Sequence, residues 1–295
     1  MNSKSTYDPT HFMLTKVYPR KFKNLAGLSN VSFHELYDLA SVAEMCALAA
    51  PDTGRAVETL LQGARLSALN MGRSALVNQK VVEMGFPLRG GAVFTPFDAY
   101  ADSLRGLIRA VMDIKEFPDE VLAVTERIGK LTIDPAIARA KARGDTLLYV
   151  PMHAGVDQFM SGEDYAKFYW PGLKNIIDKA VAAGLIPYIF CEGRYNTRLE
   201  FLKDVPEKKV IYMFEQVDIV RAKRELDGIA CVCGNLPTAL LCTGTPEQVV
   251  NETKRMLDAC APGGGFIMDC SIVLQDAKRE NFDAWYETTM TYGCY

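Results

Sequence analysis

Polar side chains follow the ends of several short apolar segments in the second half of the chain. These residues are His153, Glu192, Glu215, Asn235 and Cys270. Apolar segments of this length, separated by stretches long enough to form helices, are typical of fully buried parallel strands. Because chemistry in such folds collects where the strands end, the five side chains are predicted to share one site.

Three of these residues are the candidates for catalysis. Glu192 is the first, because its carboxylate could protonate an oxygen as a group departs, or bind a metal ion. The alternative is a structural carboxylate paired with Arg194 or Arg198. His153 could carry a proton or ligate a metal near neutral pH, and a purely structural histidine is an equal alternative. Glu215 is the third candidate, and capping of a loop is its structural alternative.

The substrate-binding candidates lie near the same strand ends. Asp157 could orient His153 or contact substrate, and a cap for the following turn explains it as well. Asn235 could bind a polar group. Aromatic side chains could line a pocket for an aromatic ether, since small-molecule sites are mostly apolar, while core filling explains most of them equally well. The aromatic candidates are Tyr188, Phe190, Tyr195 and Tyr212.

The elements that must position these residues alternate regularly after residue 144. Strands are predicted at 147–150, 186–190, 210–214, 229–232 and 266–268, with a doubtful one at 30–34. Helices are predicted at 35–84, 99–114, 118–128, 162–183, 198–203, 218–225, 246–260 and 279–289. The chain is interpreted as one domain over 1–295, with 1–25 as an N-terminal arm. A closed β/α barrel needs eight strands, so the barrel is predicted to be incomplete.

Composition limits the classes of function. The chain is 49% hydrophobic and 23% charged, which is typical of a soluble globular protein and gives no apolar stretch long enough to span a bilayer. A net charge of −3 offers no basic surface, so nucleic-acid binding is not expected. Eight cysteines without a secretory signal indicate reduced thiols in a cytoplasmic protein.

Several motifs, in their order and spacing, resemble the uroporphyrinogen decarboxylase superfamily. Among them are Pro96-Phe97-Asp98, Leu104-Arg105-Gly106, Phe159-Met160-Ser161, Phe190-Cys191-Glu192-Gly193, Gly234-Asn235-Leu236-Pro237 and Thr245-Pro246-Glu247. Within the superfamily, the chain is most similar to methyltransferases that move a methyl group from a methoxylated or methylated small molecule to a corrinoid protein, of the O-demethylase methyltransferase I type.

The resemblance implies a (β/α)8 TIM-barrel-like fold whose first two strands are absent from this chain. It implies cobalamin on a partner corrinoid protein, and zinc as a possible cofactor. Similar enzymes hold zinc with a His-x-Cys-Gly motif and a later cysteine, whereas Phe190, Glu192 and Cys270 occupy those positions here. The metal ligands suggested are therefore Glu192, Cys270 and His153.

Two other interpretations stay open. One is a cobalamin-independent lyase or decarboxylase on the same scaffold, which would use the carboxylates and His153 for proton transfer. The other is a subunit that completes the barrel of another chain. Unpaired barrel edges promote association, so a homo-oligomer or a heteromer that supplies the missing strands is expected.

Overall fold

The centre of the molecule is a parallel sheet of five strands arranged in chain order. The computed structural model describes residues 53–88, 90–272, 274 and 276–293. The strands are β1 Leu147–Met152, β2 Ile186–Arg194, β3 Ile211–Gln216, β4 Cys231–Cys233 and β5 Phe266–Ile267. All five predicted strands are confirmed. The predicted arm 1–25, the doubtful strand 30–34 and the helix before residue 53 lie outside the described residues.

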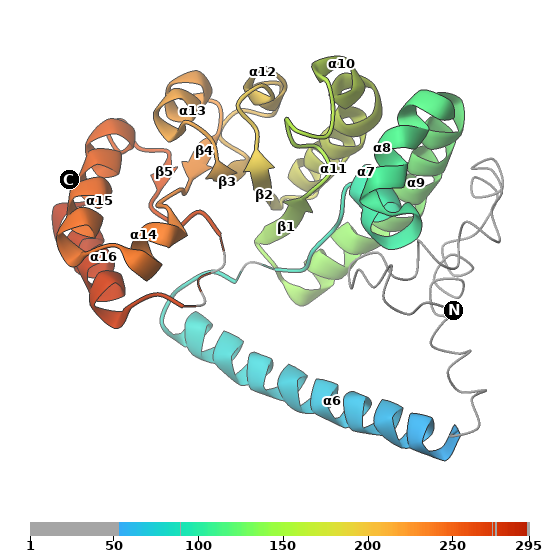
Figure 1. The fold of residues 1–295 in the computed structure, drawn as a ribbon, viewed down its shortest axis with the longest axis horizontal. Coiled ribbons are helices and arrows are strands. Elements are labelled where there is room, and N and C mark those ends of the chain that lie inside the picture. Colours follow the sequence, from blue (N-terminus) through green and yellow to red (C-terminus); the bar gives the residue numbers. More distant parts are fainter. Residues whose placement is uncertain (1–52, 89, 273, 275, 294–295) are drawn as a thin grey trace.

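Helices precede the sheet and connect its strands (Figure 1). Before the sheet come α6 Thr53–Glu83, α7 Pro96–Tyr100, the π-helix η1 Ala101–Arg105, α8 Leu107–Glu116 and α9 Pro118–Arg143. Between and after the strands come α10 Gly162–Asp164, the π-helix η2 Tyr165–Tyr169, α11 Trp170–Ala182, α12 Leu199–Leu202, α13 Ile219–Leu226, α14 Thr238–Thr243, α15 Pro246–Cys260 and α16 Arg279–Tyr292. The α/β class is therefore confirmed.

Two predicted helices differ from the observed ones, and one observed helix was not predicted. The helix predicted at 99–114 is interrupted by η1 and by Gly106, whose φ of 85° breaks the helix. The helix predicted at 118–128 continues through Pro135 and ends only at Gly144, which adopts the left-handed conformation common after helices. Helix α14 was not predicted, because its six residues are too few to show a helical period.

A further extended segment pairs with the outer edge of β1. The N–H of Val93 donates to the carbonyl of Tyr149 at 2.9 Å, and the N–H of Tyr149 donates to the carbonyl of Gly91 at 3.1 Å. A single bridge at Ala92 leaves too few residues to show a strand pattern in the sequence. Within the described residues the barrel is not closed, and α6 lies apart from the sheet (Figure 1).

Side chains alternate between the two faces of the sheet. On one face, Tyr149 and Tyr188 stand opposite each other with ring centroids 6.0 Å apart, and the Tyr188 hydroxyl donates to the sulfur of Met213 at 3.1 Å. On the other face, side chains such as Ile189 and Tyr212 join the core beneath the helices. Glu192, four positions after Tyr188 in β2, and Glu215, two positions after Met213 in β3, therefore lie on the Tyr188 face. No described helix is long and apolar enough to cross a membrane.

Candidate functional site

A buried carboxylate fixes the chain where β1 ends. Asp98 of α7 accepts the backbone N–H groups of His153 at 3.3 Å and Ala154 at 2.8 Å. It also accepts the hydroxyls of Thr95 at 2.9 Å and Tyr169 at 2.5 Å. Burial, helped by a second nearby carboxylate, raises the pKa of Asp98 to about 6. Asp98 thus sets the backbone that carries His153.

The imidazole of His153 lies between two carboxylates. Its Nδ1 is 2.5 Å from Oδ2 of Asp102, which projects from η1, and its Nε2 is 3.4 Å from Oε2 of Glu192. The ring of Phe94 meets the imidazole edge-on, with centroids 6.0 Å apart. We call Asp102, His153 and Glu192 the carboxylate–histidine row. The predicted proximity of His153 and Glu192 is therefore observed.

The electrostatics of the carboxylate–histidine row favour the protonated forms of His153 and Glu192. Burial lowers the pKa of His153, but the hydrogen bond to Asp102 and the charges of Asp98, Asp102 and Glu192 outweigh it and raise that pKa to about 9. Burial raises the pKa of Glu192, His153 lowers it, and the charges of Glu215 and Asp102 raise it further. The net direction is upward. Groups of this kind can donate a proton near neutral pH.

A bulge in β2 directs Glu192 towards His153. The register between β2 and β3 shifts between Cys191 and Arg194, and Gly193 has a φ of 94°. Oε2 of Glu215 accepts the Gly193 N–H at 2.5 Å and so holds the bulge. Bulges near active sites commonly re-aim a side chain. Glu215 therefore lies behind Glu192 and supports its backbone.

The arginine alternatives for Glu192 are not observed. The guanidinium of Arg198 is 1% exposed and binds the loop after β1 instead, donating to the carbonyls of Gly155 at 3.1 Å, Val156 at 3.2 Å and Met160. Its charged carbon also lies 4.7 Å from the centre of the Tyr165 ring. Arg198 is thus a structural clamp.

Asp157 joins two loops and does not contact His153 through any hydrogen bond found in the described structure. Its carboxylate accepts the Thr197 hydroxyl at 2.7 Å and the Thr197 N–H at 3.3 Å, and it lies 3.7 Å from Nε of Arg198. Its side chain turns towards the loop after β2 and does not orient His153 in this structure, and its role as a substrate contact stays a prediction.

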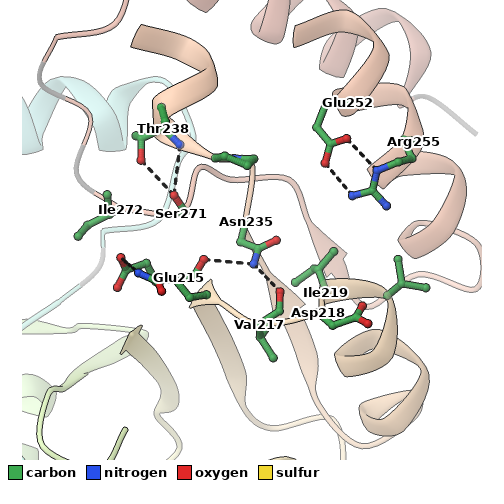
Figure 2. A pocket seen from close by; sticks show the side chains of 14 residues that line it. Glu215, Val217, Asp218, Ile219, Asn235, Thr238, Glu252, Arg255, Ser271 and Ile272 are labelled. Carbon is green, nitrogen blue, oxygen red and sulfur yellow. Dashed lines mark hydrogen bonds and ion pairs between the residues drawn. The ribbon is translucent and has the colours of Figure 1, made fainter. Parts of the chain in front are cut away.

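A cavity of about 480 Å³ adjoins the ends of β3, β4 and β5 (Figure 2). Glu215, Asn235, Thr238, Arg255 and Ser271 are among its lining residues, and we call it the strand-end cavity. Its volume lies in the range of small-molecule sites. The Asn235 amide donates to the carbonyls of Glu215 at 3.2 Å and Val217 at 2.9 Å. The structure therefore brings Glu215 and Asn235 to a space that a ligand could fill.

The aromatic candidates divide between the two faces of the sheet. Tyr188 and Phe190 share the face of Glu192. Tyr212 is fully buried, and its hydroxyl donates to the Leu202 carbonyl at 3.2 Å, on the helix side of the sheet. Tyr195, just beyond the bulge, is fully buried in the core. Neither Tyr195 nor Tyr212 is among the residues that line the strand-end cavity, and their role as substrate contacts stays a prediction.

The suggested metal ligands do not fit a zinc site. The Cys270 thiol donates to the carbonyl of Ile272 at 3.2 Å, and burial with the neighbouring Asp269 raises its pKa to about 11. In the part of the chain that the structure describes, no three His, Cys, Asp or Glu side chains are arranged to hold a metal ion. The described structure therefore does not bring Glu192, Cys270 and His153 together as a metal site, and no chemistry is assigned to zinc.

Sequence reasoning missed two residues of the site, Asp98 and Asp102. A signal for Asp98 was present, because Thr95 stands three residues before it, which is the spacing of a capping box. Asp102 follows four residues later, on the same side of a helix. Their relation to His153 spans more than 50 positions, and no local pattern reveals it.

Comparison with known proteins gives the family. The model for uroporphyrinogen decarboxylase (URO-D) matches residues 75–292. A methylcobamide:CoM methyltransferase MtbA of Methanosarcina mazei is 29% identical over 157 residues, covering 52% of this chain and 44% of that protein. The MtbA of Methanosarcina acetivorans is 32% identical over 142 residues, covering 44% of this chain and 40% of that protein. A uroporphyrinogen decarboxylase of Chlorobaculum parvum is 23% identical over 222 residues, covering 75% of this chain and 60% of that protein.

These matches span about half the length of the relatives. A solved structure, described as a methyltransferase from Methanosarcina mazei, aligns with a TM-score of 0.56 at 15% identity, covering 69% of this chain and 58% of that chain. At this identity the likeness concerns the fold, which is TIM-barrel-like although the sheet of the described residues is open. The motifs, the match over residues 75–292 and the parallel sheet agree that the chain belongs to the uroporphyrinogen decarboxylase (URO-D) family.

Proposed function

We propose that this protein transfers a methyl group from a methoxylated or methylated small molecule to the cobalt of a corrinoid protein. The observation that carries the proposal is the carboxylate–histidine row, which presents a proton donor where β1 and β2 end. The two MtbA relatives, named methylcobamide:CoM methyltransferases, support the reaction class. The corrinoid belongs to a separate partner protein, whose reduced cobalt is the methyl acceptor.

The residues of this chain would act on the leaving oxygen or nitrogen. When the bond to the methyl carbon breaks, the electron pair stays on the departing atom, and Glu192 donates a proton to it. Tyr188 and Phe190 lie on the same face of the sheet and are the proposed apolar contacts of the substrate. Glu215 and Asn235 line the strand-end cavity, which is the proposed place for the rest of the molecule.

A methyl-transfer assay tests this proposal. The protein is mixed with a corrinoid protein reduced to cobalt(I) and with a panel of methoxylated aromatic compounds and methylated amines, and the cobalt spectrum is followed. Methylation that depends on both the substrate and this protein supports the proposal. If the substrate is converted while the cobalt stays unmethylated, a different reaction is shown.

The second candidate is a cobalamin-independent lyase or decarboxylase. The observation that favours it is the Chlorobaculum parvum decarboxylase, whose match covers 75% of this chain. The same row would then move a proton to or from a carbon of the substrate. Release of carbon dioxide without any corrinoid would establish this reaction.

We also propose that the working form is an oligomer or a heteromer. The bridge at Ala92 and strand β5 form the two ends of an open sheet in the described structure, and open strand edges readily pair with another chain. Native mass measurement tests this, and a stable monomer that carries out the reaction would contradict it. The single-domain boundary and the cytoplasmic location stay predictions.

A further inference from the structure

Asp102 has a position that the proposed reaction does not yet explain. It lies within a continuous helix, because Tyr100 before it has helical angles of φ −65° and ψ −49°, so it does not cap a helix end. Among the described residues, the hydrogen bond found for its carboxylate is the one to Nδ1 of His153, at 2.5 Å. Its side chain is 19% exposed, which leaves limited access to water.

The helix around Asp102 is held on both sides. The Tyr100 hydroxyl donates to Oδ2 of Asp113 at 2.6 Å, and Nε of Arg105 donates to the same oxygen at 2.5 Å. The Asp113 side chain is fully buried. Asp102 stands between these two anchored residues, within a π-helix, a form of helix that often occurs at functional sites. Rigid support of this kind is what a group that orients another side chain requires.

The backbone of His153 is fixed independently of its ring. Asp98 binds the N–H groups of His153 and Ala154, so the position of Cα does not depend on Asp102. What Asp102 adds is the orientation of the imidazole and the identity of the nitrogen that carries hydrogen. An acceptor at Nδ1 places a hydrogen there and leaves Nε2 directed at the partner on the other side.

We propose that Asp102 is a positioning residue that fixes the His153 imidazole with Nδ1–H towards itself and Nε2 towards Glu192, so that His153 can return a proton to Glu192. In this step the Nε2–H bond breaks, an O–H bond forms on Oε2 of Glu192, and the positive charge leaves the imidazolium. Solvent then restores the proton of His153. The catalytic role of the step rests on the proposed function, whereas the orientation of the ring does not.

Nitrogen-15 NMR of the full-length protein, labelled at its histidines, tests the orientation without any substrate. The wild type is measured well above pH 9, where most of His153 is neutral because its pKa is about 9, and a His153→Gln variant assigns its signals. The expected result is hydrogen on Nδ1. In Asp102→Asn the amide can donate to Nδ1, and hydrogen is expected on Nε2. The exposed Glu163→Gln, which also removes one carboxylate charge, should leave the Nδ1–H form unchanged.

The catalytic part is tested by the split between kcat and KM. General acid–base groups contribute about 100- to 10,000-fold, so a misdirected imidazole should lower kcat by at least about 10-fold and leave KM within about 2-fold. Asp102→Glu, which keeps an acceptor, should recover part of the loss. A wild-type spectrum with hydrogen on Nε2 overturns the proposal, even if Asp102→Asn does not fold. An unchanged kcat in folded Asp102→Asn overturns the catalytic part, and absence of methyl transfer in the wild type overturns only the proposed function.

Discussion

The edge of the sheet where the strands end carries two groups of polar residues that are built differently. We call the group at β1 and β2 the first end, and the group at β3, β4 and β5 the second end. Around β1 and β2 the charged groups are paired with one another over short distances: Asp102 with His153, and His153 with Glu192. Around β3, β4 and β5 the polar groups mainly bind the backbone or each other and surround a cavity of about 480 Å³. Asn235 donates to two carbonyls, and the Ser271 hydroxyl lies 3.0 Å from that of Thr238 (Figure 2).

Under the proposed function, this difference separates chemistry from binding. A proton donor needs a defined neighbour and an altered pKa, and the first end provides both. A substrate needs space and a few fixed polar groups, and the second end provides those. Glu215 connects the two, since it lines the cavity and its carboxylate holds the bulge beside Glu192. Variants at the first end should therefore change kcat, and variants at the second should change KM.

The largest effect is expected from Glu192→Gln. The amide keeps the size of the side chain but cannot donate a proton to the leaving atom, so kcat for methyl transfer should fall by about 100- to 10,000-fold. KM should change by less than about 3-fold, because the cavity is untouched. The measurement is the initial rate of cobalt methylation over a range of substrate concentrations. A large rise in KM with an unchanged kcat would show that Glu192 binds the substrate and has no role in proton transfer.

The next effect concerns stability and compares one arginine from each end. Arg198→Met leaves the buried carbonyls of Gly155, Val156 and Met160 without their donor, and should lower the free energy of unfolding by about 3 kcal/mol. Arg255→Met is the matched control. Its side chain is 54% exposed and pairs with Glu252, so the loss should stay below about 1 kcal/mol. Urea unfolding measures the loss of unfolding free energy in both variants. Equal losses would contradict the contrast between a rigid first end and an open second end.

The sequence predicts the strands that form the two ends better than it predicts the contacts between their side chains. The five strands were predicted because their apolar runs are visible locally in the sequence. The π-helix that presents Asp102 has no such local signal. Tyr212 lies on the helix side of β3, and a continuous apolar run such as 210–214 does not show which alternate positions face the helices. The pairing of Asp102 with His153 depends on tertiary packing alone.

A smaller effect is expected from filling the strand-end cavity. Ser271→Leu places three carbon atoms where a hydroxyl now faces Thr238, which reduces the space for a substrate. KM should rise by about 10-fold, equivalent to about 1.4 kcal/mol of binding, while kcat stays within about 3-fold. Thr243→Val, on the same helix as Thr238 but not among the residues that line this cavity, is the control. An unchanged KM would show that the substrate does not enter this cavity.

The smallest expected effect is a dependence of stability on pH that belongs to the first end. The folded pKa of His153 is about 9 and lies above its ordinary value of 6.5, so the folded state binds this proton more tightly than the unfolded state does. The stabilisation is complete below pH 6.5 and is lost as pH rises through 9. The ring is 33% exposed, so solvent screening keeps the effect small.

Urea unfolding of the wild type and of His153→Gln at several pH values measures this dependence. The difference in unfolding free energy between the two proteins should shrink steadily from pH 6.5 to above 9, because only the wild type loses the charged imidazole. The same series in Arg255→Met should follow the wild type, since that arginine has no contact with His153 among those found in the described residues. A difference that stays constant, or grows with pH, would mean that Asp102 and Glu192 do not hold the proton on His153. The division into a first end for chemistry and a second end for binding would then lose its electrostatic basis.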